Sequence, residues 1–180
     1  MENLKTRRKR LGFSLLLLIA LVGGCWLFSG TWVIIYKVDD EEIHATQDFY
    51  KFTVDITQED VWKEHKDHLD DIEDVSITFK LINPFISPAT GQVYVSSDSS
   101  LSDSAAVTSS ATIILDGITI PGEDTLHVDM AHYYDLLQNF QTLKHLVKTG
   151  MFTAYALVPA PLAIELRDVV VVVTFSAGLS

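Results

Sequence analysis

The sequence predicts a mainly β protein, an antiparallel β-sandwich with two short amphipathic helices, preceded by an N-terminal hydrophobic anchor helix. Three observations support this fold class. Apolar and polar residues alternate with period two from residue 38 onward, only two segments show helical spacing, and an uncharged apolar run follows a basic N-terminus. The 180 residues, 48% of them hydrophobic, suit one folded domain with an anchor.

Residues 1–36 have the pattern of a signal or anchor segment. Five basic residues lie within the first ten, and Leu11–Tyr36 carries no charge. A helix over that range would reach about 39 Å at ~1.5 Å per residue, enough to cross a ~30 Å hydrocarbon core. The basic residues predict a cytoplasmic N-terminus, which places residues 37–180 outside the cytoplasm, in the periplasm or at the cell surface.

The single cysteine leaves two alternatives for this segment. Leu21-Val22-Gly23-Gly24-Cys25 resembles the lipobox of bacterial lipoproteins, in which Cys25 would be lipidated and become the new N-terminus. The apolar residues after Cys25 favour instead an uncleaved transmembrane helix. Both alternatives predict a membrane-anchored protein.

Residues 52–175 contain eight expected strands. Asp116-Gly117 is a good hairpin turn between two of them, and the run Val169–Val173 predicts an interior strand that is buried on both faces. Many short strands with turn signals indicate an immunoglobulin-like sandwich as the domain of residues 37–180. The expected strands are 52–56, 75–81, 93–95, 111–115, 118–120, 126–128, 151–158 and 163–175.

Two helices are expected between these strands. The first starts at a capping-box-like Thr57–Asp60 and continues through Val61, His65, Leu69 and Ile72 at helical spacing. The second starts at Asp129, a natural N-cap, and ends at Gly150. The Ser- and Asp-rich stretch 96–110 is expected to be an exposed loop or an edge hairpin.

The region Val75–Phe175 resembles the LEA14-like (water stress and hypersensitive response type) domain. The resemblance rests on a strand that ends in Asn83-Pro84, a strand set that contains Ile118-Thr-Ile-Pro121, an amphipathic segment up to Gly150 and a closing strand pair. It implies a small β-sandwich with no known catalytic residues and a stress-protective role.

The densest polar cluster is a candidate metal site. His65 and His68 lie three residues apart on the expected helix and Asp71 follows one turn later, a set that could bind zinc or nickel. The alternative is a solvated acidic helix face. His127, Asp129 and His132 form a second, weaker candidate, and nothing in the sequence indicates a cofactor.

Charge and missing motifs limit the function. The net charge of −11 argues against nucleic-acid binding, and the sequence has no Gly-x-Ser-x-Gly elbow and no phosphate-binding loop. We therefore expect a non-enzymatic, membrane-tethered protein of the cell envelope that acts by contact with the membrane and with a protein partner. The alternatives are a ligand or metal carrier and a stress-protective protein.

Overall fold

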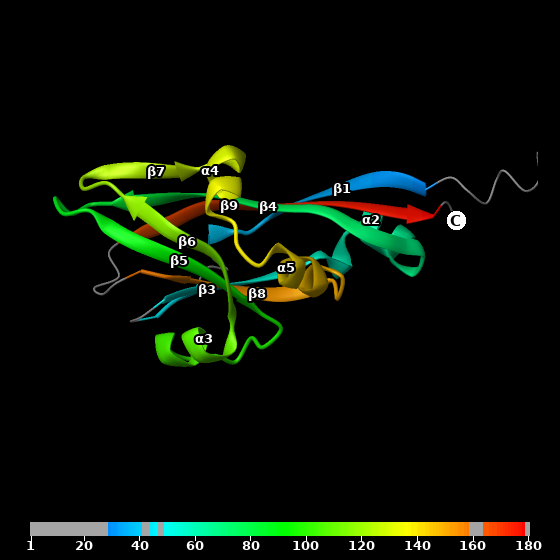
Figure 1. The fold of residues 1–180 in the computed structure, drawn as a ribbon, viewed down its shortest axis with the longest axis horizontal. Helices are drawn as coiled ribbons and strands as arrows, with labels where there is room; N and C mark the ends of the chain where they lie inside the picture. Colours follow the sequence, from blue (N-terminus) through cyan, green and yellow to red (C-terminus); the bar gives the residue numbers. More distant parts are fainter. Residues whose placement is uncertain (1–28, 41–43, 47–48, 159–163, 179–180) are drawn as a thin grey trace, which may run out of the picture.

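The computed structural model describes residues 29–40, 44–46, 49–158 and 164–178, and these form two antiparallel sheets (Figure 1). Within the described residues, the first sheet has four strands in the order β1 (Ser29–Lys37), β9 (Glu165–Gly178), β4 (Leu69–Asn83) and β7 (Asp124–Val128). The second has five strands in the order β2 (His44–Ala45), β3 (Phe49–Asp55), β8 (Met151–Leu157), β5 (Ala89–Ser96) and β6 (Thr112–Ile120). The expected mainly β, sandwich-like architecture is confirmed.

The core lies between the two sheets because each strand buries alternate side chains. Along β9, Val169, Val171, Val173, Phe175 and Ala177 are buried, whereas the residues between them are half-buried. The interior position of Val169–Val173 is confirmed, since β1 and β4 pair with β9 on its two sides. Burial on both faces was wrong, because Val170 and Val172 on the outer face are only half-buried.

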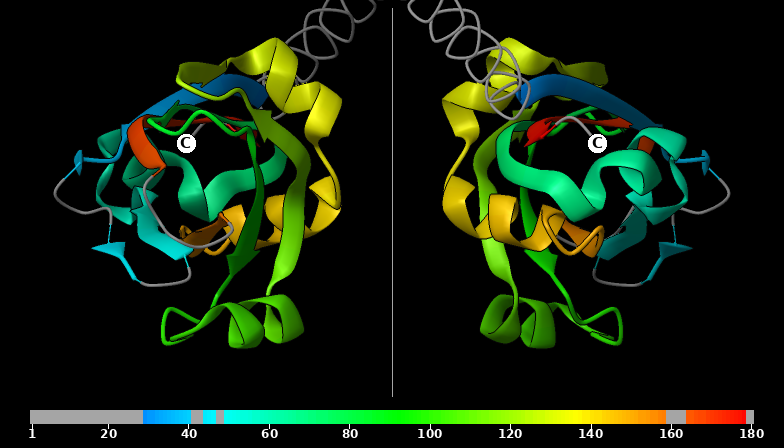
Figure 2. Two further views of the ribbon diagram at one scale, coloured as in Figure 1. Left: turned by 90° about the vertical axis from the view of Figure 1, so that its left-hand side faces the viewer. Right: turned by 90° about the vertical axis from the view of Figure 1, so that its right-hand side faces the viewer.

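Short helices cover several parts of the sandwich. The helix α3 (Ser104–Ser110) covers the outer side of the second sheet, and the pair α4 (Met130–Leu136) and α5 (Phe140–Val147) covers one flank (Figure 2). The opposite flank is bordered by β1 and β3. Three short helical segments, η2 (Ile56–Gln58), α2 (Asp60–His65) and η3 (Lys66–His68), connect β3 to β4.

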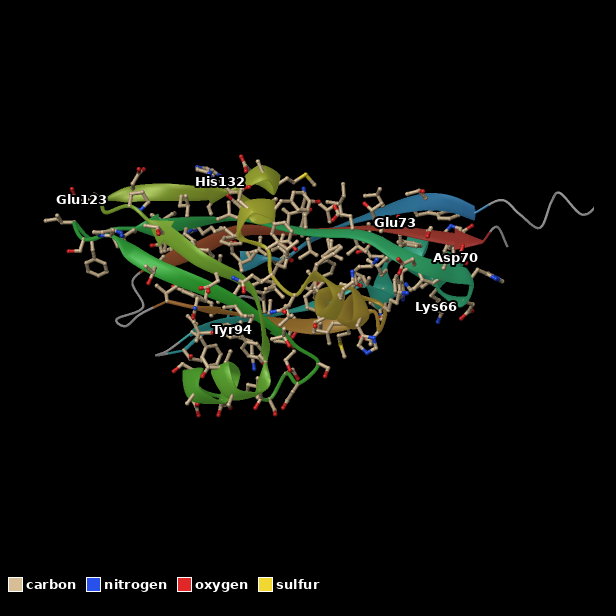
Figure 3. All side chains as sticks on the ribbon, viewed as in Figure 1. Lys66, Asp70, Glu73, Tyr94, Glu123 and His132 are labelled. Atoms are coloured by element: carbon tan, nitrogen blue, oxygen red, sulfur yellow. The ribbon has the colours of Figure 1, made fainter. Side chains whose placement is uncertain are left out.

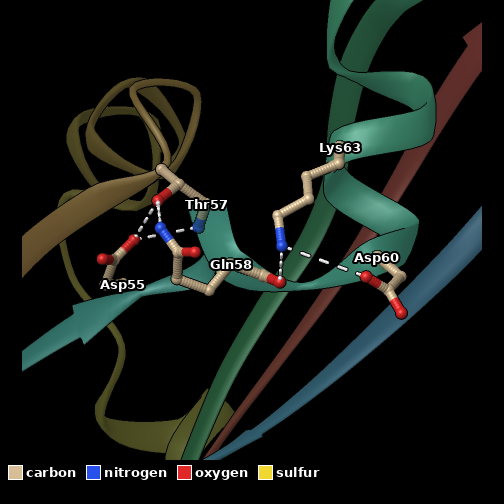
Figure 4. Close-up of polar contacts among 5 residues, drawn as sticks. All are labelled: Asp55, Thr57, Gln58, Asp60 and Lys63. Atoms are coloured by element: carbon tan, nitrogen blue, oxygen red, sulfur yellow. Dashed lines mark hydrogen bonds and ion pairs between the residues drawn. The ribbon is translucent and has the colours of Figure 1, made fainter.

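The first expected helix is much shorter than its apolar spacing indicated. Its helical turns end at His68, and Leu69 and Ile72 lie in β4, where Leu69 pairs with Ala177 of β9. Strand pairing with β9 therefore overrides the helical spacing. The N-terminal cap also differs, because Asp55 rather than Thr57 caps η2, and the Thr57 backbone N–H donates to Asp55 Oδ1 at 2.9 Å (Figure 4).

The second expected helix begins as predicted and then breaks. Asp129 is the N-cap of α4 and accepts from the His132 backbone N–H at 2.9 Å. The helix stops at Leu136, and Asn139 takes a left-handed conformation with φ 49° before α5 begins. The reason is that the intervening residues 137–139 pair with β6 instead of continuing the helix.

Two further expectations about local structure were wrong. Asp116-Gly117 is not a hairpin turn but an irregularity within the single strand β6, where Gly117 has φ 74°. The Ser-rich stretch contains α3, which Asp103 caps, and Val107 of that helix is fully buried beside Tyr94 and Tyr155. One buried valine gives a helix enough packing to form in an otherwise polar stretch.

The apolar N-terminal run enters the sandwich earlier than expected. Residues 29–36, assigned above to the anchor, lie in β1. Leu11–Phe28 and the candidate lipidation site Cys25 lie outside the described residues. No helix in the described part of the chain is both long and apolar enough to span a membrane.

Candidate functional site: the open edge of β1

The strand β1 is paired on one side only within the described residues. It is the first strand of its sheet and hydrogen-bonds to β9 in a register from Ser29 opposite Gly178 to Lys37 opposite Val170. The Val38 backbone N–H donates to the Val169 carbonyl oxygen at 3.0 Å, which makes these two residues a hydrogen-bonded pair. Because such pairs alternate in an antiparallel ladder, the even-numbered residues of β1 bond to β9.

The odd-numbered residues of β1 therefore direct their N–H and C=O groups away from β9. These are residues 29, 31, 33, 35 and 37. We call this row of backbone groups the β1 edge. Exposed backbone donors and acceptors of this kind are a template for another strand.

The side chains of the β1 edge are exposed and apolar over most of its length. Val33 is 51% exposed and Ile35 is 61% exposed, among the highest values for large hydrophobic residues in the described chain. The strand carries no charge before Lys37. Edge strands that avoid contact usually carry charges, proline or bulges, and β1 has none of these before its last residue.

Aromatic side chains pack on β1 from the inner side. The ring of Trp32 lies over Gly30, where an added Cβ would come within 2.4 Å of the indole. The Trp32 ring centroid is 4.0 Å from that of His65 and 6.1 Å from that of Phe175. The absence of a side chain at Gly30 thus makes room for the indole, which ties β1 to α2 and β9.

A hollow of about 420 Å³ lies beside the β1 edge on the flank that the helices leave uncovered. Tyr36 of β1 lines one side, and the other lining residues are Lys51, Phe52, Thr53, Asp55, Gln58 and Glu59. Its polar wall is fixed by hydrogen bonds around Asp55 and by Lys63, which contacts the Gln58 carbonyl oxygen and Asp60 (Figure 4). Hydrogen bonds therefore hold the polar side of this hollow in place.

The other sheet edges of the described chain are short or covered. β2 has two residues, and β7 has five, of which Asp124 is charged. Residues 137–139 cover the part of the β6 edge at residues 113–115: Leu137 bridges Leu115, and the Gln138 backbone N–H donates to the Ile114 carbonyl oxygen at 2.8 Å. The nine-residue β1 edge is the long uncovered one among them.

The structure does not place His65, His68 and Asp71 on one helical face. His65 is buried at 6% exposure against Trp32, His68 is exposed, and Asp71 lies in β4. The helix that would have aligned them ends before Asp71. No group of three His, Cys, Asp or Glu side chains within the described residues is placed to hold a metal ion.

Asp71 instead forms ion pairs with α5. Its carboxylate lies 2.7 Å from Lys144 Nζ and 2.9 Å from Lys148 Nζ. Hydrogen bonds from Lys144 and then Lys148 lower the pKa of Asp71 to about 2. Its neighbours Asp70 and Glu73 are exposed to solvent (Figure 3). The cluster fastens α5 to the first sheet.

The second histidine candidate surrounds a shallow hollow of about 520 Å³ on the outer side of β4 and β7. Asp129 is engaged as the cap of α4, and His132 lies beside it on the helix. Lys80 pairs with Asp168 at 2.6 Å, and this contact lowers the pKa of Asp168. Asp129, Lys80 and Asp168 around this hollow therefore each have a partner among the described residues.

The β1 edge was missed in the sequence because both faces of the strand are apolar near the N-terminus. The alternation of inward Trp32, Ile34 and Tyr36 with outward Thr31, Val33 and Ile35 is hidden within an uncharged run. The β-branched and aromatic content of residues 31–36 was the available signal. No protein-family model and no curated protein matches this chain.

Proposed function

We propose that this chain is a non-enzymatic protein, tethered to the outer side of a membrane, that acts by contact through the β1 edge. The observation that carries the proposal is a nine-residue edge strand with exposed Val33 and Ile35, whose outward backbone groups pair with no other strand of the described residues. Exposed apolar surface together with an open edge is typical of a protein–protein contact.

The tether part of the proposal rests on the sequence that precedes β1. Leu11–Phe28 is uncharged and would span about 27 Å as a helix at ~1.5 Å per residue, close to a ~30 Å hydrocarbon core. Lipidation at Cys25 would give a tether of another kind. In both cases the chain enters β1 without a polar linker, so the β1 edge would lie close to the membrane surface.

The same proposal covers the relationships of the sandwich and a protective role. The sandwich would be related to immunoglobulin-like domains, and the resemblance to LEA14-like domains implies a stress-protective role. Protection of a labile enzyme during freezing by the purified chain would support that role, and equal losses with and without the chain would oppose it. The metal-carrier alternative is not taken further, because its three residues are not aligned.

Site-directed cross-linking in membranes tests the contact. Single cysteines at Ile35 on β1 and at Ser109 on α3 would be treated with a short thiol-to-amine cross-linker in cells that express the full chain. Both side chains are exposed, which makes Ser109 the matched control. We expect protein adducts from Ile35→Cys beyond the background of the natural Cys25, and none from Ser109→Cys. Equal yields from the two positions would contradict contact through β1.

A further inference from the structure

We infer that the β1 edge pairs with the β1 edge of a second copy of this chain, in antiparallel orientation around a twofold axis at Val33. This inference rests on the proposed contact function and names its partner. The hydrogen-bond phase of β1, the position of its charge and the site where the N-terminal segment joins it all support it.

The alternation of hydrogen-bonding residues along β1 fits a symmetric pair of strands. Val33 directs its N–H and C=O groups to the open side, as the alternation set by the Val38–Val169 hydrogen bond requires. With Val33 opposite Val33 of the second copy, Thr31 faces Ile35 and residue 29 faces Lys37. Each of these positions offers both a donor and an acceptor, so about ten backbone hydrogen bonds could form across the axis.

The charges on the strand allow the same register. Lys37 is the only charged residue of β1, and in the antiparallel pair the two Lys37 residues lie at opposite ends. They are separated by eight residue steps, or about 27 Å at ~3.4 Å per residue. The centre of the contact holds Val33 and Ile35 of both copies, and these exposed apolar side chains would cover one another.

The site at which the N-terminal segment joins β1 favours a second copy over an unrelated strand. The 28 residues outside the description end where β1 begins, so a tether would hold every copy with its β1 edge near the same membrane. In an antiparallel pair, the twofold axis stands perpendicular to the sheet. If the outer face of β1 lies toward the membrane, both N-termini reach it. Tethering then raises the effective concentration of one copy around the other, so a small interface is enough for pairing.

Disulfide formation in the full chain tests the register. Cysteines at position 33 of two copies would have Cα atoms about 5.5 Å apart, within disulfide reach, whereas cysteines at position 35 would lie about 14 Å apart. We expect Val33→Cys to form a covalent dimer on mild oxidation in membranes and Ile35→Cys not to. Co-expressed Thr31→Cys and Ile35→Cys chains should form a mixed dimer, and the unmodified chain controls for Cys25.

The possible outcomes separate this inference from the proposed function. Equal dimer yields at positions 33 and 35 would overturn the register. A Val33→Cys adduct only with a protein of another mass would overturn self-pairing but leave contact through β1 in place. If position 33 and the cross-linker experiment at Ile35 both gave no adduct, both proposals would fail.

A charge at the axis gives a second test that does not rely on cysteine. Val33→Lys places two like charges opposite each other, and the exposed position lets the fold tolerate the change. We expect this variant to run as a monomer in mild detergent with an unchanged melting temperature, whereas the parent runs as a dimer. Thr174→Lys, on the neighbouring strand β9, is the matched control and should remain a dimer. A monomeric parent chain would overturn the inference.

Discussion

The edge strands β1 and β6 differ in how far other parts of the described chain cover their open sides. Both strands have nine residues and end a sheet. The β6 edge is covered at residues 113–115 from within the chain, because the break between α4 and α5 places residues 137–139 along this part of it. Asn139 adds a hydrogen bond from its side-chain amide to the Ile113 carbonyl oxygen at 2.9 Å. At β1 no described segment makes such contacts.

The uncovered edge of β1 does not result from poor packing of the strand. β1 is held by the aromatic group around Trp32 and by a complete register with β9, so its inner side is well packed. Natural sheets usually protect long edges. Within the described residues the β1 edge is long, apolar and uncovered, which is why the proposed contact is assigned to it.

The largest expected effect comes from placing a charge on the inner face of β9, the strand to which β1 pairs. Val171 of β9 is fully buried, and Val171→Asp would place an unpaired charge in the core. We expect a loss of several kcal/mol in the free energy of unfolding, measured by urea denaturation. Val172→Asp, on the half-buried outer face of the same strand, is the control and should cost much less. Equal losses would contradict the assigned inner face.

A smaller loss is expected from removing the inner support of β1. Trp32→Ala deletes the ring that packs on His65 and Phe175, and we expect about 2 kcal/mol of destabilisation because the ring is only partly buried. Amide exchange along β1 should accelerate while that of β6 stays constant. If β6 loosened equally, the two edges would not be independently supported.

The covered edge can be opened at Asn139. Asn139→Ala removes the hydrogen bond to Ile113 and puts alanine at φ 49°, which we expect to cost about 2 kcal/mol. Asn139→Gly tolerates the backbone conformation and should cost about 1 kcal/mol, mostly for the lost hydrogen bond. Thermal or urea unfolding measures both values. Equal stability of the two variants would show that backbone strain contributes nothing at this break.

The smallest effect concerns the attachment of α5, whose preceding segment covers β6. The pKa of Asp71 is about 2 in the folded chain, below its ordinary value of 3.8, so its ion pairs stabilise the fold above pH ~4. This contribution is lost as the pH falls from about 4 to about 2. We expect Asp71→Asn to be slightly less stable than the parent at pH 7 and equal to it below pH ~2. Asp70→Asn, at an exposed neighbour, should not show this convergence.

The sequence predicted the regular parts of the fold and missed the parts that tertiary pairing decides. The valine run of β9 predicted an interior strand, and the alternation in residues 75–81 predicted a strand, because successive side chains of a strand point to opposite faces. The spacing of Leu69 and Ile72 was misleading, since pairing with β9 decides their conformation. The candidate metal residues needed that helix to share one face, and without it His65, His68 and Asp71 do not lie together.

Site-resolved amide hydrogen exchange along β1 of the full chain in mild detergent tests the central claim most directly. The even-numbered amides from residue 30 to residue 36 bond to β9 and should exchange slowly in every folded form. If two copies pair, the amides of Thr31, Val33 and Ile35 also exchange slowly in the parent chain and become fast in Val33→Lys. Fast exchange at these three amides in the parent, unchanged by Val33→Lys, would contradict pairing of two copies through the β1 edge.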